Sequence, residues 1–315
     1  MNFIALSDSH LLWHKPQARI DDIRLTQWQK WSFMLQYATD TGSSILEAGD
    51  FFNANRSWYL LPEIMDLLKK YGVPIYCVFG QHDTYLYNEK TRAATSLGIL
   101  EKAGMVKILD DNPTFTSSPD PVVIYGSSFG QSIHDPKSDP PEIGNFFKIL
   151  VIHASIAEFA MYPNQKYMDA LTFLKDNPFG LIVAGDIHQK FIKSYDGRYI
   201  VNSGPLIRKE ATAYNFNHHP GFFTFNTNTP DIAPQFIEVP HRPAEEVLTR
   251  SHIEYEKEAD SILDSFISAV ENPEIDDGVE IVENIWAFVK KNNIEQSVVD
   301  IIAETINKHA GREEV

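Results

Sequence analysis

The chain has 315 residues, of which 43% are hydrophobic, a composition typical of a globular protein with a sizeable core. Its 27 Lys and Arg stand against 43 Asp and Glu, and the net charge of −16 opposes general attraction to a polyanion. Any contact with nucleic acid must therefore be local, metal-mediated or supplied by a partner. The sequence has no run of about 18 apolar residues and no basic leader, so we expect no membrane span and a cytoplasmic location. The single cysteine, Cys77, excludes an intrachain disulfide and fits a reducing compartment.

The first third of the chain alternates strand-like and helical patterns. Short apolar runs predict strands, while apolar residues at helical spacing predict covering helices, the second of them capped by Ser57. This alternation favours parallel strands whose carboxyl ends meet at one edge of a sheet. The predicted strands span residues 2–6, 44–48 and 73–79, and the predicted helices span residues 20–38, 57–71 and 90–103.

The remainder divides into a strand-rich part and a helical part. A Pro-rich stretch at 131–144 predicts a surface loop, and polar turns separate four later strands that we expect to form a hairpin meander. Helical spacing from residue 252 onward predicts three helices, over 252–270, 278–291 and 295–309. We therefore expect one domain over 1–243 and a helical C-terminal region over 244–315. The further predicted strands span 106–109, 122–125, 147–152, 181–184, 191–195, 199–202, 221–226 and 235–240.

Polar side chains follow the predicted strands at the points where each strand ends. In an extended segment, residues two apart point to the same side, so pairs such as Asp8 and His10 can converge on one ion. Neutral imidazoles and carboxylates suit divalent first-row ions, and a shared carboxylate can bridge two ions about 3.5 to 4 Å apart. The pattern favours a paired metal site. The strand-end residues are Asp8, His10, Asp50, Gln81, His82, Asp83, His153, Asp186 and His188.

Taken together, these motifs resemble those of the calcineurin-like metallophosphoesterase superfamily. The family pattern is D-x-H, G-D-x-x-[D/N/E], G-N-H-[D/E], a lone His, and G-H-x-H, and five motifs in that order are highly specific. The resemblance covers about residues 1 to 240 and implies an α/β fold with a two-sheet β-sandwich flanked by helices. The matching residues are Asp8-Ser9-His10, Gly49-Asp50-Phe51-Phe52-Asn53, Gly80-Gln81-His82-Asp83, His153 and Gly185-Asp186-Ile187-His188.

The resemblance also implies a role for each of these residues. It places Asp8, His10, Asp50 and His188 around one metal ion, and Asp50, Gln81, His153 and Asp186 around a second. A metal-activated hydroxide would attack phosphorus. His82 would stabilise the transition state or protonate the leaving oxygen, and Asp83 would orient the His82 ring.

Two residues depart from the family pattern, and both fall on the second metal. Gln81 replaces the usual Asn, and Asp186 replaces the usual His. The resulting oxygen-rich ligand set favours Mn²⁺ or Mg²⁺ over Zn²⁺. The alternative is a second site that is weakened or empty.

Within the superfamily the chain most resembles the SbcD-type DNA nucleases, the meiotic-recombination-eleven group, in its short phage-type form. This resemblance implies a Mn²⁺-dependent DNA exo- and endonuclease of DNA repair and recombination. It also implies a homodimer and an SbcC-type coiled-coil ATPase partner, which the C-terminal helices could bind. The residues that carry it are Ser7 to Leu11, Arg19 to Asp22, Gly49 to Phe52, Gly185 to Gln189 and Asn202 to Arg208.

Two other functions remain open at this point. One is a stand-alone phosphodiesterase or phosphatase that acts on a nucleotide or a phosphoprotein, which the acidic charge favours. The other is a catalytically weakened scaffold with structural metals, whose helical region recruits a partner. Lys190, Lys193, Arg208 and Lys209 could contact phosphates or serve the fold alone, and the His218-His219 pair is interpreted as part of a solvated loop.

Overall fold

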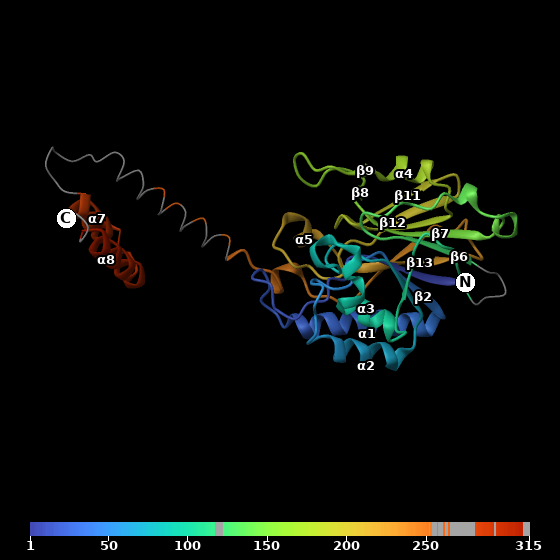
Figure 1. Cartoon of the computed structure of the whole chain (residues 1–315), viewed down its shortest axis with the longest axis horizontal. Coiled ribbons are helices and arrows are strands. Elements are labelled where there is room, and N and C mark those ends of the chain that lie inside the picture. Colours follow the sequence, from blue (N-terminus) through green and yellow to red (C-terminus); the bar gives the residue numbers. More distant parts are fainter. Residues whose placement is uncertain are drawn as a thin grey trace. The chain divides into compact units, whose positions relative to one another are not determined.

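The computed structural model describes residues 1–116, 122–251, 281–292 and 294–310, together with positions 253, 257, 261 and 264. The chain forms two compact units, Met1–Thr249 and Arg250–Val315 (Figure 1). The first unit holds both large sheets and all of the strand-end residues named above.

The first sheet has six strands in the order β14-β13-β1-β2-β3-β4. The central strands β1, β2, β3 and β4 run parallel, and the β13–β14 hairpin adds antiparallel to β1. Parallel pairing brings the carboxyl ends of β1, β2 and β3 to one edge. The bounds are β1 Asn2–Leu6, β2 Ser43–Glu47, β3 Ile75–Cys77, β4 Lys107–Ile108, β13 Gly221–Asn226 and β14 Gln235–Glu238.

The second sheet also has six strands, in the order β11-β12-β10-β7-β6-β5. Its four inner strands are parallel, and β5 and β11 pair antiparallel at the edges. A short separate pair joins β8 Ile156–Ala157 to β9 Met168–Asp169. The other bounds are β5 Thr114–Phe115, β6 Val122–Ser127, β7 Phe147–Ala154, β10 Leu181–Asp186, β11 Phe191–Tyr195 and β12 Arg198–Asn202.

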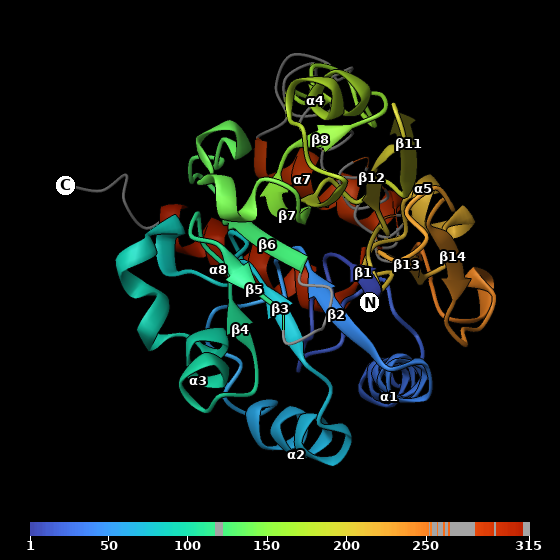
Figure 2. The ribbon, with the colours of Figure 1, turned by 90° about the vertical axis from the view of Figure 1, so that its right-hand side faces the viewer.

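Helices cover the two outer faces of the sandwich (Figure 2). The helices α1, α2 and α3 lie outside the first sheet, and α4 lies outside the second. Short 3₁₀ turns fill the connections. The helices are α1 Ile23–Thr41, α2 Leu61–Tyr71, α3 Ser96–Lys102, α4 Ala170–Asp176 and α5 Ala213–Asn217; the 3₁₀ turns are Tyr85–Tyr87, Glu89–Ala94, Pro136–Ser138, Pro141–Ile143 and Ala244–Glu246.

Successive side chains of β1 point to opposite faces of the first sheet and so pack against different layers. Phe3 and Ala5 pack between the two sheets, whereas Ile4 and Leu6 pack against the helices on the outer face. All four side chains are buried, because a central strand of this four-layer arrangement has core on both sides. The expected α/β fold, a two-sheet sandwich flanked by helices, is therefore confirmed.

The helix ends agree in part with the predicted ones. Asp22 caps α1 by accepting a hydrogen bond from the Leu25 N–H, and Gly42 ends this helix in the left-handed conformation at φ 61°. Ser57, however, does not cap α2, since its hydroxyl donates to the Ala54 carbonyl and the helix begins only at Leu61. The prediction of a helix from residue 57 was therefore wrong in its start.

The predicted meander of late strands is divided between the two sheets. β11 and β12 extend the second sheet, while β13 and β14 extend the first. Strand alternation in the sequence identifies hairpins, but it does not say which sheet edge receives each of them. The expected loop at 131–144 contains two 3₁₀ turns, at Pro136–Ser138 and Pro141–Ile143.

The second unit contains two described helices, α7 Ile281–Lys291 and α8 Gln296–Ala310, close to the predicted positions. The helix predicted over 252–270 lies largely outside the described residues. None of the helices in the described part of the chain is long and apolar enough to cross a membrane. The boundary at residue 243 between a catalytic domain and a functional tail stays a prediction.

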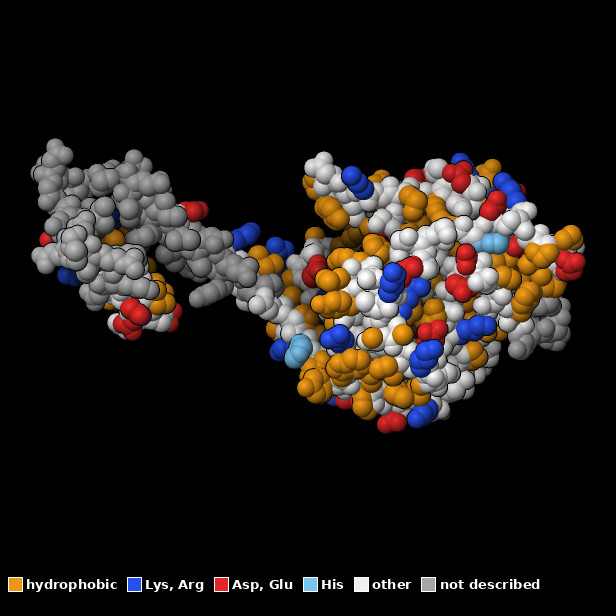
Figure 3. Space-filling view, viewed as in Figure 1, with side chains coloured by type: hydrophobic (Ala, Val, Ile, Leu, Met, Phe, Trp, Pro, Cys, Tyr) orange, Lys and Arg blue, Asp and Glu red, His pale blue; other side chains and the backbone are white. Residues whose placement is uncertain are grey.

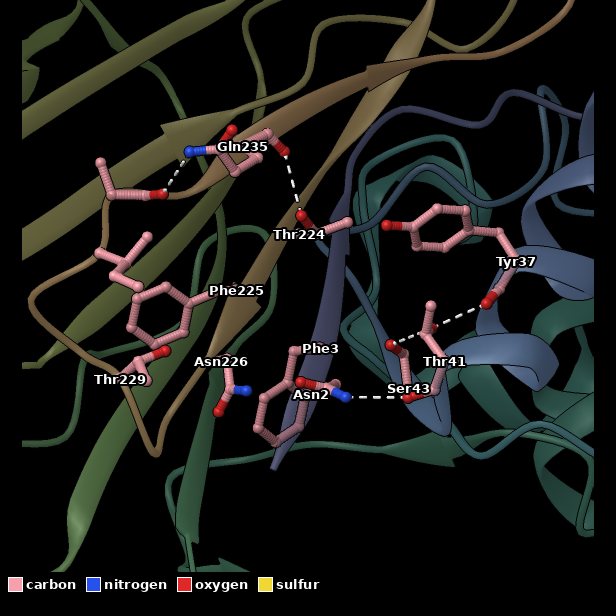
Figure 4. A pocket seen from close by; sticks show the side chains of 12 residues that line it. Asn2, Phe3, Tyr37, Thr41, Ser43, Thr224, Phe225, Asn226, Thr229 and Gln235 are labelled. Atoms are coloured by element: carbon pink, nitrogen blue, oxygen red, sulfur yellow. Dashed lines mark hydrogen bonds between the residues drawn. The ribbon is translucent and has the colours of Figure 1, made fainter.

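A pocket of about 190 Å³ lies at the opposite edge of the first sheet, where β1 and β2 begin. Figure 4 shows Phe3 and Phe225 on its wall, with the Asn2 amide donating to the Thr41 carbonyl nearby. In sheets with parallel strands the reactive groups lie at the carboxyl ends, so the functional groups of this sheet are expected at the other edge.

Candidate metal centre

The functional side chains come together where the central strands of both sheets end. Asp8 follows β1, Asp50 follows β2, His153 lies near the end of β7 and Asp186 ends β10. The backbone links the first two loops, since the Asp8 N–H donates to the Gly49 carbonyl at 3.2 Å and the His10 N–H donates to the Asp50 carbonyl at 2.8 Å. Both sheets therefore contribute to a single cluster.

One group in this cluster consists of Asp8, His10 and His188. The Nε2 atoms of His10 and His188 are 2.9 Å apart, and His188 Nε2 lies 3.7 Å from Asp8 Oδ1. The ligand atoms of the three residues all lie within 4.8 Å of one another. The structure thus brings together three of the four residues assigned to the first ion. The fourth, Asp50, lies close to them, with its Oδ2 3.8 Å from His10 Nε2.

A second group surrounds His153. Its Nδ1 lies 2.6 Å from the Ala48 carbonyl, which leaves Nε2 facing Gln81 Oε1 at 2.7 Å and Asp50 Oδ2 at 3.7 Å. The Gln81 amide also donates to Asp186 Oδ1 at 2.8 Å. The two departures from the family pattern, Gln81 and Asp186, are thus in direct contact with each other.

Asp50 lies between the two groups. Its Oδ1 accepts a hydrogen bond from the His82 N–H at 2.8 Å, and its Oδ2 lies 3.7 to 3.9 Å from the Nε2 atoms of His153, His10 and His82. The side chain is 1% exposed. This position fits a carboxylate that serves both ions.

The residues present fit bound divalent cations. Asp8 Oδ2 and Asp50 Oδ2 are buried and accept no hydrogen bond among the described residues. A buried carboxylate oxygen without a donor is costly unless a cation approaches it. Burial, followed by the charge of Lys209, lowers the pKa of His10 well below its usual range, which keeps its ring neutral as a ligand must be.

Electrostatics within the cluster favour the uptake of positive charge. Burial raises the pKa of Asp50 to about 8, with the Asp83 and Asp8 carboxylates adding to the effect and His153 opposing it. Burial opposes protonation of His153, but Asp50, Asp8 and Asp186 outweigh it and raise the pKa of His153. Both pKa shifts show that the field of the clustered carboxylates favours positive charge at this position.

In the structure the hydrogen bonds of Asp83 run to the backbone rather than to the His82 ring. Its buried carboxylate accepts backbone hydrogen bonds from Gly80, Phe51 and Phe52, at 3.0, 3.2 and 3.0 Å. His82 Nδ1 instead lies 3.2 Å from the Asn53 carbonyl, so that this carbonyl orients the ring. Asp83 is a positioning residue that ties the third motif to the second, because three N–H donors turn its carboxylate away from His82.

His82 itself lies on the rim of the cluster. Its side chain is 44% exposed, and its Nε2 lies 3.9 Å from Asp50 Oδ2. Burial and then Lys209 lower the pKa of His82, while the Asn53 hydrogen bond acts in the opposite sense. A ring so placed can reach a substrate that lies over the cluster.

Strained backbone accompanies the cluster. Asp8, His10, Asp50 and Asp186 all have positive φ, at 52°, 43°, 54° and 94°, a region that non-glycine residues seldom adopt. Such conformations cost roughly 1 to 3 kcal/mol each and concentrate at functional sites. Gly80 is required for a different reason, since a methyl group there would collide with the Asp50 carboxylate.

Two further side chains contribute to the site: Ser155, which no sequence motif identified, and Lys209, which was predicted only as a possible phosphate contact or structural residue. The Ser155 hydroxyl donates to Asp186 Oδ2, and its position two residues after His153 is the signal that could have found it. Lys209 Nζ donates to Asn53 Oδ1 at 2.7 Å, which brings a cation next to His82 and His10. Of the other basic candidates, Lys193 forms an ion pair with Glu158.

The His218-His219 pair was predicted to belong to a solvated loop, and this prediction was wrong for His218. His218 is 3% exposed, and its Nε2 lies 2.8 Å from the Pro205 carbonyl. His219 is exposed and lies 3.3 Å from Glu238. Burial of His218 lowers its pKa to about 3, which fits a neutral structural ring.

Comparisons with known proteins agree with this geometry. Residues 1–190 match the family described as calcineurin-like phosphoesterase. No curated protein matches the chain in sequence.

Solved structures with a similar fold have low sequence identity. TT1561 of Thermus thermophilus is 13% identical with a TM-score of 0.47 over 76% of this chain and 99% of that one. An archaeal phosphodiesterase is 12% identical, with a TM-score of 0.40 over 75% of this chain and 100% of its own. A putative 5'-nucleotidase from Staphylococcus aureus is 11% identical, with a TM-score of 0.47 over 84% of this chain and 58% of that one. Since the family match spans more than half of the chain, the protein belongs to the calcineurin-like phosphoesterases, metal-binding hydrolases of phosphoester bonds.

Proposed function

We propose that this phosphoesterase is an SbcD-like DNA exo- and endonuclease that uses two divalent ions, with Mn²⁺ preferred. The observation that carries the proposal is a row of exposed aromatic side chains beside the metal centre. Unpaired bases stack on aromatic rings at about 1 to 3 kcal/mol per base, so a row of several such rings suits a nucleic-acid strand.

The row begins next to a candidate metal ligand. The Phe129 ring is 38% exposed and lies 6.3 Å from the His153 ring, and the Tyr87 ring, 70% exposed, lies 6.0 Å from Phe129. Tyr85 is 48% exposed, with the Arg56 guanidinium 5.6 Å from its ring. The Phe129 N–H donates to the Phe79 carbonyl, immediately before the Gly80 turn. Bases that stack here would place a neighbouring phosphate over the cluster.

The chain's own residues supply defined parts of the chemistry. Asp8, His10, Asp50 and His188 would hold one ion, and Asp50, Gln81, His153 and Asp186 the other. Bound divalent ions supply a nucleophile from water at neutral pH and neutralise charge on phosphoryl oxygens.

Two further side chains act on the substrate side. His82, whose Nδ1 faces the Asn53 carbonyl, presents Nε2 to the substrate. The negative charge of a bound phosphate favours protonation of this ring, and the imidazolium would then donate the Nε2 proton to the leaving oxygen. Lys209, held by Asn53 Oδ1, adds positive charge next to this ring.

The charge of the chain bears on its partners. Acidic and basic side chains are intermixed on the face of the first unit shown in Figure 3, and the net charge is −16. A polyanion is therefore held by the local site and by a partner rather than by a broad basic surface. We propose an SbcC-type coiled-coil ATPase as that partner, bound by the helical region, and a homodimer as the working form. Val298 and Ile301 on α8, 43% and 64% exposed, support a partner contact there.

The proposal is tested with two substrates. The full chain in Mn²⁺ should cleave labelled single-stranded DNA as well as bis-p-nitrophenyl phosphate, and Asp50→Ala should remove both activities. Phe129→Ala and Tyr87→Ala should lower kcat/KM on DNA about tenfold or more, the loss of roughly one stacked base, and leave the small diester unchanged. Phe115→Ala, which alters an exposed aromatic away from the cluster, is the matched control.

The outcomes discriminate among the functions. Activity on the small diester without DNA cleavage would replace the nuclease with a stand-alone phosphodiesterase, which the acidic charge favours. Absence of both activities in the metal-loaded protein would leave a metal-binding scaffold. Equal effects of Phe129→Ala and Phe115→Ala would remove the stacking argument.

A further inference from the structure

A second pocket, of about 230 Å³, is lined by positively charged side chains away from the metal centre. It lies between the start of α1, the segment after β12 and the segment after β14. Its cationic lining consists of Arg19, Lys30, Arg208 and Arg242, with His241 beside them.

Three of these cations are buried, and two of them have no carboxylate partner. Arg19 is 2% exposed and is neutralised by Asp21, whose two oxygens accept from it at 2.8 and 2.6 Å. Lys30 and Arg208, 1% and 3% exposed, form no ion pair within the described part of the chain. A buried charge without a partner costs several kcal/mol, so an anion at this position would be strongly favoured.

The hydrogen bonds of the two cations are also incomplete. Lys30 Nζ donates to the Leu206 carbonyl at 2.7 Å, and Arg208 donates through one terminal nitrogen to the Arg242 carbonyl. Arg208 Nε is buried and has no hydrogen-bond partner in the described structure. Donors therefore remain on both side chains for a ligand in the pocket.

Electrostatic crowding points to the same ligand. Burial, followed by the charges of Arg208 and Arg19, lowers the pKa of Lys30 well below its usual range, against the opposing charge of Asp21. Burial and then Arg19 lower the pKa of Arg208, with Asp21 and Glu245 opposing. An anion would relieve the repulsion that the two neighbouring carboxylates leave uncompensated.

The chemistry of the donors selects the anion. A guanidinium fork combined with an ammonium group is the donor set that proteins use for phosphate oxygens. The pocket volume is several times the roughly 30 Å³ that one water molecule occupies in the liquid, so a phosphate group fits. We propose that this pocket is a phosphate-binding site separate from the metal centre, formed chiefly by Lys30 and Arg208.

The adjacent residues Arg208 and Lys209 point to different sites. Arg208 lines the pocket, while Lys209 reaches Asn53 at the metal centre. A phosphate held by Arg208 thus anchors the segment that carries Lys209. Phosphate binding in the pocket requires neither hydrolysis at the metal centre nor DNA as the substrate.

Calorimetric titration of the metal-loaded full chain with inorganic phosphate tests the proposal. Two binding events are expected, one lost in Asp50→Asn and the other weakened at least tenfold in Lys30→Met and in Arg208→Gln. Lys70→Met, the same substitution at an exposed helical lysine, should retain both. Because each pocket variant removes an uncompensated charge, its Tm in phosphate-free buffer should equal or exceed that of the unmodified chain.

The phosphate could be free or could belong to a nucleic acid. Parallel titrations with a short oligonucleotide, with and without a 5'-phosphate, distinguish the two sources, since the pocket variants weaken only the ligand that occupies the pocket. Weaker pocket binding of inorganic phosphate, or of the 5'-phosphorylated oligonucleotide, in the pocket variants supports the site. Undiminished binding of all ligands by both pocket variants, equal weakening in Lys70→Met, or loss of only the Asp50-dependent event in the pocket variants overturns it.

Discussion

Asp50 contacts His82 through both of its carboxylate oxygens, with Oδ1 accepting the His82 N–H at 2.8 Å and Oδ2 lying 3.9 Å from the His82 ring nitrogen Nε2. Asp50, the carboxylate expected to serve both ions, therefore fixes the backbone position of His82, the candidate proton donor. Because His82 is 44% exposed and Asp50 is 1% exposed, the pair joins the buried metal cluster to the substrate side.

Substitution of His82 separates catalysis from metal binding. We expect His82→Ala to retain both ions and to lower kcat by about 10² to 10⁴, most strongly for substrates with poor leaving groups, because proton donation is lost. Metal content by mass spectrometry and kcat on two aryl phosphodiesters measure this. His14→Ala is the control, and loss of an ion from His82→Ala would assign this residue to the metal instead.

Restoring the usual family residues should change the preferred metal. Gln81 and Asp186 contact each other at 2.8 Å, so we expect the double variant Gln81→Asn, Asp186→His to gain affinity for Zn²⁺ relative to Mn²⁺. A nitrogen ligand favours Zn²⁺, whereas the present oxygen-rich set favours harder ions. Competition calorimetry with the two ions measures the ratio. An unchanged ratio would contradict this account of metal choice.

Metal binding should release a proton from Asp50. Since its folded pKa is about 8 without metal, the carboxyl is largely protonated at pH 7 and must lose its proton to bind an ion. Mn²⁺ affinity should therefore rise with pH up to about 8 and then level off. Calorimetry in buffers of different ionisation enthalpy counts the protons released. An affinity for Mn²⁺ that stays constant between pH 6 and 8 would exclude this linkage.

Lys30 should make stability depend on pH in a known direction. Its folded pKa is lowered, whereas the unfolded chain keeps the proton up to a pKa of about 10.4, so the unfolded state binds more protons between these values. The free energy of unfolding should rise with pH across that window. Lys30→Met should remove this rise and should be at least as stable as the unmodified chain at pH 7, because the variant no longer buries an ammonium group.

Urea unfolding in phosphate-free buffer at several pH values measures this effect of Lys30. The exposed Lys70→Met variant should reproduce the pH dependence of the unmodified chain. A Lys30→Met variant that is less stable than the unmodified chain at pH 7 would show that the buried ammonium is satisfied by Leu206 alone.

Much of the fold and the choice of candidate residues followed from local pattern. Apolar runs that end in Asp8, Asp50, His153 and Asp186 identified the strands and the edge at which they meet, because parallel strands carry their carboxyl ends to the same side. Boundaries were less accurate, as with Ser57, because a hydroxyl can hydrogen-bond to a nearby carbonyl instead of a helix N–H.

The sequence by itself determined which chemical groups stand at the strand ends, because strand alternation and turn chemistry are local properties. Only the tertiary structure decided what those groups contact. Asp83 faces backbone donors from Phe51 and Phe52 rather than the adjacent His82 ring, and Arg208 and Lys209 line different sites although they are neighbours in sequence. Contacts between segments distant in sequence depend on how the two sheets pack, and no local pattern encodes that packing.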